Sequence, residues 1–186
     1  EAISGLSAAF GLSGSAGLNA YIPLLVVALA ARFPMSDPLV KLQAPFDLMG
    51  SWWAIGLIAV LLVIEIVADK IPAIDSINDG IQTFIRPAAG AILFAGSANV
   101  ITDIHPILSL GAGLLVAGGV HATKAAARPV VTVTTAGVGN PVVSTLEDIV
   151  AVVVSLLAVV LPIIAAVILL VFLIFIITIV RRWRRR

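Results

Sequence analysis

Ionisable side chains are scarce in this sequence, and those inside its apolar stretches follow helical spacings. Lys, Arg, Asp and Glu make up only 11% of the 186 residues. Glu65 and Asp69 are four positions apart, which places two carboxylates on one face of a helix. His121, Lys124 and Arg128 follow each other at spacings of three and four, so a second helix would present a basic face. We therefore expect the acidic and the basic face to pair with each other.

The position of Glu65 is the most informative of these. It lies more than one helical turn inside an apolar stretch. An ionisable group at such a depth costs about 2.5–3.5 kcal/mol on membrane-insertion scales and usually marks a polar interior or a pathway. Two interpretations stay open: a buried ion pair that fixes how the helices pack, and a site that binds or conducts a solute.

Other polar residues are expected on the same side of the molecule as these two faces. Six acidic and four basic residues fall there, so their charges nearly balance. Such a set could form an ion-pair network, a path for protons or cations, or an acid–base site in which His121 is the group with an unperturbed pKa near neutrality. The residues that we predict for a substrate or ion site are Glu65, Asp69, Lys70, Asp75, Arg86, His121, Lys124, Arg128, Asn140, Ser144, Glu147 and Asp148.

The sequence offers little for covalent or metal chemistry. It contains no Cys, and only one of its two His residues, His121, falls in the polar set. It has no nucleophile elbow, phosphate-binding loop or dinucleotide-binding fingerprint. We therefore assign no catalytic residue and expect no metal and no cofactor.

The elements that carry these residues are typical of a membrane protein. Apolar residues make up 61% of the chain, against about 45–50% in an ordinary globular domain. A helix that crosses a bilayer core needs about 20 apolar residues. The pattern predicts a single all-α, polytopic transmembrane domain with about five spans. Their expected ranges are 3–31, 52–69, 88–103, 107–124 and 149–180.

Two stretches are expected to depart from a simple span. Residues 75–86 have an acidic and an apolar face, which predicts a short amphipathic helix, either at the membrane interface or re-entrant. Pro162 interrupts the last stretch, so residues 149–180 should form one kinked helix or two pieces.

Small residues are concentrated in the ranges 3–31, 88–103 and 107–124. They favour close helix packing, and short similarities around Gly14 and Gly96 are compatible with a duplicated helical hairpin. A second interpretation is that residues 14–23 form a broken helix that lines a cavity, as in transporters. The residues that we predict to line it are Gly14, Gly17, Asn19 and Tyr21.

The basic tail, residues 181–186, bears on orientation and partners. Because Lys and Arg collect on the cytoplasmic side of membranes, we expect a cytoplasmic C-terminus and a polar site on the opposite side. We expect the tail to contact the anionic lipid leaflet rather than nucleic acid, through Arg181, Arg182, Arg184, Arg185 and Arg186. A chain this short leaves little room for alternating access, so we also expect a homo-oligomer.

Six segments together resemble one known family. They read SAGLNAYIPL (15–24), EIVADKIP (65–72), DS (75–76), TFIRPAAGA (83–91), HATKAAAR (121–128) and GNPVVSTLED (139–148). The chain is similar in them, and over most of residues 4–165, to the bacterial membrane family catalogued as domain of unknown function 4126. The resemblance implies an α-helical, multi-pass protein of the bacterial cytoplasmic (inner) membrane, and it draws attention to the polar residues named above. It implies no activity.

Three functions are compatible with this sequence. The first is transport or channel-like permeation of a small polar or amphipathic solute. The second is a membrane enzyme or lipid-binding protein that acts on a phosphate-bearing head group, with His121 as acid–base and with Arg86, Lys124 and Arg128 holding the phosphate. The third is a structural or scaffold protein whose charges only fix the fold. An enzyme is the less favoured of the first two.

Overall fold

The computed structural model describes residues 2–33, 40–42, 44–97 and 105–162, together with single positions between 164 and 181. Within these ranges the chain is entirely helical and contains no strand, which confirms the predicted all-α class for this part. The elements are α1 (Ala2–Leu18), α2 (Tyr21–Arg32), a short 3₁₀-helix η1 (Phe46–Gly50), α3 (Trp52–Ala68), α4 (Pro72–Ser97), α5 (Pro106–Thr135) and α6 (Asn140–Val160).

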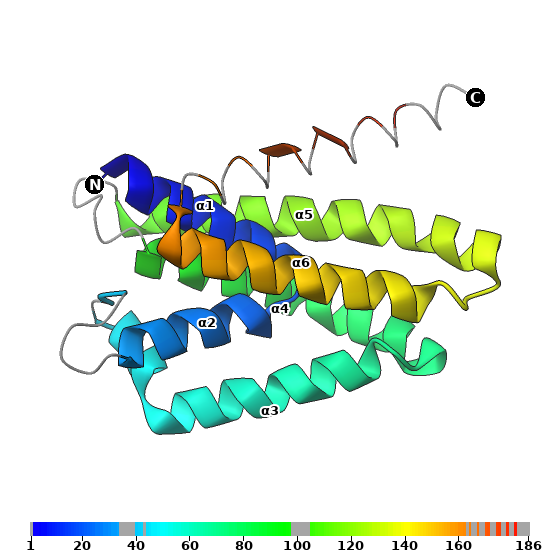
Figure 1. Ribbon diagram of the computed structural model, residues 1–186, viewed down its shortest axis with the longest axis horizontal. Helices are drawn as coiled ribbons and strands as arrows, with labels where there is room; N and C mark the ends of the chain where they lie inside the picture. Colours follow the sequence, from blue (N-terminus) through cyan, green and yellow to red (C-terminus); the bar gives the residue numbers. More distant parts are fainter. Residues whose placement is uncertain are drawn as a thin grey trace.

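The first apolar stretch is a hairpin of two helices. α1 runs into the molecule and ends at Leu18, and α2 returns toward the end from which α1 started (Figure 1). The predicted single span over residues 3–31 is therefore wrong. The reason is Asn19, whose side-chain Oδ1 accepts hydrogen bonds from the backbone N–H groups of Tyr21 and Ile22, each at 3.1 Å, and so starts a second helix. The predicted interruption between residues 14 and 23 is observed at Asn19 and Ala20.

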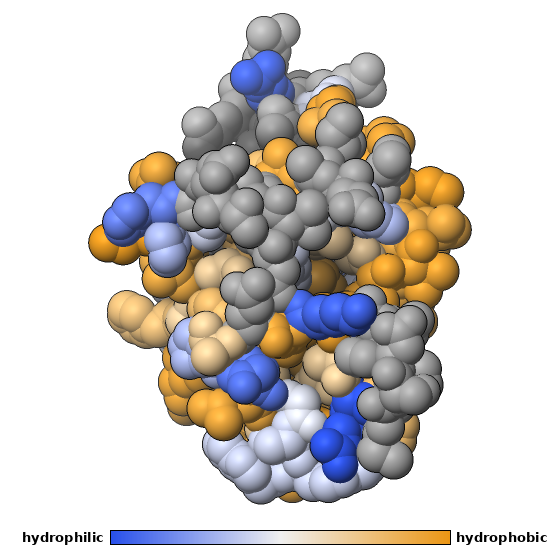
Figure 2. Space-filling view, turned by 90° about the vertical axis from the view of Figure 1, so that its left-hand side faces the viewer, coloured by the Kyte–Doolittle hydropathy of each residue, from blue (hydrophilic) through white to orange (hydrophobic). Residues whose placement is uncertain are grey.

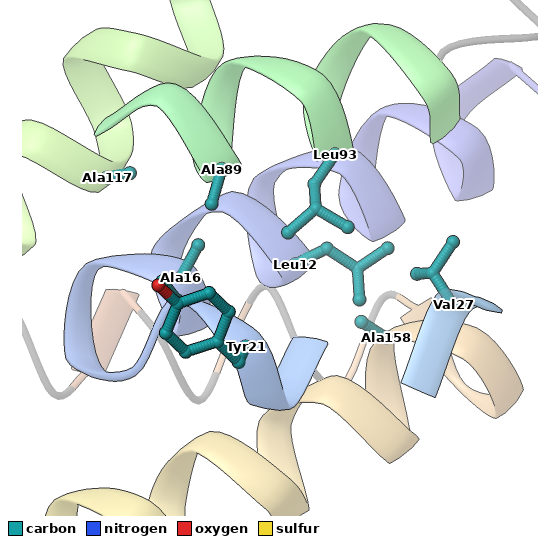
Figure 3. Close-up of a cluster of buried hydrophobic side chains, with 9 residues drawn as sticks. Leu12, Ala16, Tyr21, Val27, Ala89, Leu93, Ala117 and Ala158 are labelled. Carbon is teal, nitrogen blue, oxygen red and sulfur yellow. The ribbon is translucent and has the colours of Figure 1, made fainter. Parts of the chain in front are cut away.

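The two arms of this hairpin pack on each other and on the centre of the bundle. Leu12 and Ala16 on α1 lie in one buried cluster with Tyr21 and Val27 on α2 (Figure 3). Ala158 on α6 completes this part of the cluster. The tip of the hairpin is therefore held inside the protein.

The predicted amphipathic helix over residues 75–86 and the described part of the predicted span over 88–103 form one helix. α4 runs from Pro72 to Ser97, with Pro87 inside it. A proline removes one backbone hydrogen bond from a helix, but here the buried side chains continue in one stripe on both sides of it. Gln82, Arg86, Ala89 and Leu93 share that stripe and hold α4 together as a single element.

α5 and α6 also extend beyond their predicted limits. α5 continues past residue 124 to Thr135, where the hydroxyls of Thr132, Thr134 and Thr135 donate to carbonyls one turn earlier. α6 begins at Asn140 instead of residue 149. It ends at Val160, before Pro162, as expected for a proline that stops a helix.

Some predictions fall outside the described part. This holds for most of residues 163–186, including Arg182, Arg184, Arg185 and Arg186 of the tail. It also holds for residues 98–104, so the predicted duplication of a helical hairpin is left untested.

Close packing of small residues is observed where α1, α4 and α5 meet. A Cβ on Gly17 would lie 2.5 Å from the carbonyl oxygen of Ala117, and one on Gly90 would lie 2.8 Å from that of Gly113. These helices approach so closely that their backbones touch, which confirms the packing interpretation for Gly17.

The helices after the hairpin alternate in direction along the long axis (Figure 1). One end of the molecule carries the N-terminus, η1, the start of α5 and the end of α6, and the other end carries the turns at 69–71 and 136–139. Seen from the first end, apolar residues form much of the flanks and hydrophilic residues lie over the end itself (Figure 2). Among the described residues, two helices, α5 and α6, are long and apolar enough to cross a membrane, where the sequence predicts five spans.

Candidate functional site

Seven charged residues from four helical segments meet toward the end that carries the turns at 69–71 and 136–139. They come from α3 and its following turn, from the first half of α4, from the second half of α5 and from the start of α6. We call them the charge centre: Glu65, Asp69, Asp79, Arg86, Lys124, Arg128 and Glu147. The predicted pairing of an acidic face with a basic face is therefore confirmed for Asp69, which lies near Lys124 and Arg128, whereas Glu65 pairs with Arg86 of α4 instead.

Arg86 and Glu65 form the most deeply buried pair. Arg86 Nη2 donates to Glu65 Oε1 at 3.0 Å, and both side chains are completely shielded from solvent. The other nitrogen, Nη1, lies 3.1 Å from His121 Nδ1 and 3.8 Å from an oxygen of Asp79. Arg86, which belongs to α4, thus contacts both Glu65 on α3 and His121 on α5.

The contacts of His121 define its tautomer. A guanidinium can only donate, so Nδ1 must accept from Arg86 and carry no hydrogen. The hydrogen then sits on Nε2 and points to Thr83 Oγ1 at 3.1 Å, while the Thr83 hydroxyl donates to the Asp79 carbonyl at 2.8 Å. Both ring nitrogens are occupied and the side chain is buried, so His121 positions Arg86 and has no nitrogen left for an incoming substrate.

Asp69 receives more donors than any other carboxylate of the charge centre. Its Oδ1 accepts from Asn78 Nδ2 at 2.7 Å and its Oδ2 accepts from Ser144 Oγ at 3.3 Å. The same Oδ2 lies 3.7 Å from Arg86 Nη2 and 3.9 Å from both Lys124 Nζ and Arg128 Nη2. Asp69 therefore sits between donors from α4, α5 and α6.

Glu147 holds the basic face of α5 to α6. Its Oε2 lies 2.8 Å from Lys124 Nζ and 3.2 Å from Arg128 Nη2. Lys124 also donates to the backbone carbonyl of Leu18 at 3.1 Å. Since Leu18 is the last residue of α1, Lys124 satisfies one of the carbonyls that a helix end leaves free and complements the negative end of its dipole.

The tip of the α1–α2 hairpin makes a second polar contact beside the charge centre. Asn19 Nδ2 donates to Asp148 Oδ1 at 2.9 Å, and Asp148 Oδ2 lies 3.7 Å from Lys70 Nζ. One turn earlier, the Ser15 hydroxyl is 2.7 Å from that of Ser155 on α6. The end of one helix and the start of the next therefore meet charged side chains inside the protein.

Most of the residues predicted for the site are brought together, and a few are not. Asn140 is buried but bonds to Thr132, at the far end of α5. The side chain of Asp75 lies outside the described part. Gly14, Asn19 and Tyr21 are buried near the hairpin tip, whereas Gly17 is a helix contact. The prediction that these residues line a cavity stays a prediction.

Sequence reasoning missed three polar residues of α4 that complete the site. Asn78 and Thr83 bond to Asp69 and His121, and Gln82 is buried beside them. The spacing of Asn78, Gln82 and Arg86 at four-residue intervals is the signal that could have found them.

Some buried polar atoms near the hairpin tip have no hydrogen-bond partner among the described residues. They are Glu65 Oε2, Gln82 Oε1 and Arg86 Nε. The Tyr21 hydroxyl lies next to Gln82 and within electrostatic range of Glu65 and Arg86. Buried polar atoms are normally paired, so these three atoms keep hydrogen-bonding capacity that a polar solute could use.

The arrangement offers groups for ionic binding. Within the described ranges, no three His, Asp or Glu side chains are grouped to hold a metal ion. The charge centre supplies buried cations, carboxylates and neutral donors, which are the groups that recognise a small charged or polar solute.

One family model matches the chain, over residues 6–182, and its description is Domain of unknown function (DUF4126). No curated protein and no solved structure matches the chain.

Proposed function

Because this chain belongs to the family of domain of unknown function 4126, as its sequence segments indicated, and because that description carries no activity, we propose a function from the charge centre. The protein is a small transporter or channel-like protein of a membrane. It moves a small polar or amphipathic solute past the α1–α2 tip. Its charged site lies on the non-cytoplasmic side.

The outer surface supports a position in a membrane. α5 and α6 have the length and composition of spans, and the outward face of α3 exposes Leu57, Val60 and Ile64. An exposed apolar surface of this extent is unfavourable in water and favourable against lipid. The remaining long helices, α3 and α4, would complete the bundle.

The single observation that carries the proposal is where α1 and α2 meet. At about 1.5 Å per residue, the 12 residues of α2 reach only about 18 Å, less than a bilayer core of about 30 Å. Backbone that leaves a helix at such a depth is tolerated where it is buried in protein or lines a polar cavity. Here it ends against Lys124 and Asp148, the arrangement that transporters use at their binding sites.

The packing of α3 supports exchange at this site. The buried residues of α3 are Ala54 and Ile55 near its start and Glu65 and Ala68 near its end. Between these ends, Ile58, Leu61 and Leu62 pack against the core but are only partly buried. A small shift of α3 would separate Glu65 from Arg86 and open the charge centre to a solute.

The geometry gives less support to an enzyme. His121 would have to exchange a proton with substrate, but both of its nitrogens are engaged by Arg86 and Thr83. A structural role is favoured by one observation, the mutual pairing of the charges. It predicts that Glu65→Gln lowers the melting temperature and leaves solute entry unchanged.

Orientation and assembly complete the proposal. The bacterial inner membrane is the proposed location, with the C-terminus in the cytoplasm and the arginines of the tail against anionic lipid. A homo-oligomer is proposed because the helices described in one chain are few for alternating access.

The test is solute entry into proteoliposomes, followed by light scattering as the vesicles swell. The panel contains small carboxylates, amines and uncharged polyols at equal osmolarity. Wild-type protein should admit at least one of them faster than empty liposomes do. Glu65→Gln should abolish this entry because it removes the charge that faces Arg86, while the neighbouring Asp69 and Asp79 keep Arg86 paired and the protein folded.

Val63→Ala on the exposed face of α3 is the matched control and should leave entry unchanged. Wild-type entry rates in Glu65→Gln, with a lower melting temperature in detergent, would support the structural role instead. No difference from empty liposomes for any solute would overturn the transport proposal.

A further inference from the structure

We infer that the donors around Asp69 form a binding site for a monovalent carboxylate, which Asp69 itself occupies in this structure. The inference rests on the proposed transport function and names its substrate class. The carboxylate of Asp69, which is attached to the backbone, occupies the position of the transported anion. The anion binds there in place of Asp69 when α3 moves.

The donors converge on Asp69 from three different helices. Asn78 and Arg86 come from α4, Lys124 and Arg128 from α5, and Ser144 from α6. The cations and neutral donors of this site are therefore complete without α3, because α3 and the turn after it supply only carboxylates, Glu65 and Asp69. The site is also buried, since Asp69 is only 2% exposed.

The fit of Asp69 in this site is loose. A hydrogen bond between a cationic nitrogen and a carboxylate is about 2.7–2.9 Å long. The three cationic nitrogens lie 3.7, 3.9 and 3.9 Å from Asp69 Oδ2, about 1 Å farther. By contrast, Lys124 reaches Glu147 at 2.8 Å. A free carboxylate, unrestrained by a backbone, could settle closer to the cations than Asp69 does.

Charge balance indicates a single negative charge on the ligand. The charge centre contains four carboxylates and three cations. Withdrawing Asp69 together with Glu65 leaves two carboxylates and three cations, and one monovalent anion makes this set electrically neutral. A dianion such as a phosphate monoester would add a further negative charge to a buried site, which is costly.

Asp69 lies where a movement of α3 would remove its carboxylate from the anion site. It lies in the short turn between α3 and α4, directly after the last residue of α3. Since the middle of α3 packs on the core only through partly buried side chains, a shift of this helix would carry Asp69 and Glu65 away from the cations together. The same movement that opens the proposed path would therefore empty the anion site.

The test is chemical rescue of Asp69→Ala by acetate, measured on the purified full chain in detergent. Sodium acetate is titrated against sodium chloride at equal ionic strength, and the melting temperature is recorded. Asp69→Ala should show a saturable rise of a few degrees with acetate over chloride, because acetate refills the site. Wild type should show no such rise, since Asp69 fills the site already.

Asp148→Ala is the matched control, because Asp148 faces one partly exposed cation, Lys70, instead of three buried ones. It should gain nothing from acetate over chloride. Asp69→Asn, which keeps the side-chain volume, is titrated in the same way. If Asp69→Ala folds only when it is purified in acetate, that outcome also supports the inference.

Equal melting temperatures in acetate and chloride for both Asp69 variants would overturn the proposed anion site. Failure of both variants to fold in either salt would also overturn it. Rescue by sulfate and not by acetate would overturn the monovalent class. This experiment measures stability, so its result does not depend on transport. Rescue by acetate in a protein that admits no solute would support the anion site and contradict the transport proposal.

Discussion

Arg86 holds the charge centre together at the scale of single residues. Its side chain is fully buried and faces Glu65, Asp69, Asp79 and His121. A buried arginine is stable only when its charge and its donors are matched, so these four neighbours explain how a cation persists inside an apolar bundle. They also leave Glu65 dependent on Arg86, because Arg86 is its hydrogen-bonding cation at 3.0 Å.

This dependence predicts a strong coupling between the two residues. Arg86→Met should lower the free energy of unfolding by about 3–5 kcal/mol, because it leaves the Glu65 carboxylate buried without a cation. Glu65→Gln combined with Arg86→Met should recover part of that loss, since no uncompensated charge remains at this pair. Unfolding curves of the two single variants and the double variant in detergent measure the coupling. Strictly additive losses would contradict it.

The sequence was sufficient to predict which charged residues meet, and insufficient to predict how. Helical spacing alone places Glu65 and Asp69 on one face, and Lys124 and Arg128 on another. The neutral partners Asn78 and Thr83 were missed. The four-residue spacing to Gln82 and Arg86 could have indicated Asn78, whereas the hydroxyl of Thr83 gives no signal until its neighbours are known. The engagement of both His121 nitrogens likewise depends on tertiary contacts.

At the scale of elements, close contact between helix backbones sets the geometry that brings α1, α4 and α5 together. Gly17, Gly90 and Gly113 mark the points of contact. A Cβ on Gly113 would collide with the backbone of α4 at Gly90 and with the side chain of Phe94. Without these glycines the helices would separate, and the cations of α5 would move away from α4.

A pair of glycines on α5 provides the matching prediction. Gly113→Ala should lower the free energy of unfolding by about 1–3 kcal/mol, because the added methyl forces the helices apart. Gly111→Ala lies two residues away on the same helix and meets nothing within 4 Å, so it should be neutral or stabilise by up to about 1 kcal/mol. Melting curves of both variants give the comparison. Equal effects of the two substitutions would contradict the backbone contact.

Helix boundaries were predicted less well than helix existence, and specific residues explain each error. Hydropathy could not reveal that Asn19 starts a new helix, since the residues on both sides are equally apolar. The boundary predicted between residues 86 and 88 is wrong, because buried contacts on both sides of Pro87 keep α4 continuous. Pro162 did mark an end, because α6 stops before it.

At the scale of the whole molecule, the hairpin changes the path of the chain. A single span over residues 3–31 would place the N-terminus and η1 at opposite ends, whereas they lie at the same end (Figure 1). The hairpin also places a pair of helix ends deep in the molecule, next to the buried charges. This combination is the reason for assigning the chain a transport function, and it makes Ala20 the position to probe.

The most direct test is thiol modification at the hairpin tip. The chain contains no Cys, so Ala20→Cys would carry its single thiol at a fully buried position beside the charge centre. Proteoliposomes of this variant are treated with a water-soluble, membrane-impermeant methanethiosulfonate, and solute entry is measured before and after. Val138→Cys in the exposed turn between α5 and α6 serves as the control. We predict that modification at Ala20 stops solute entry and modification at Val138 does not; unchanged entry after complete modification at Ala20, verified by mass, would contradict the proposed path.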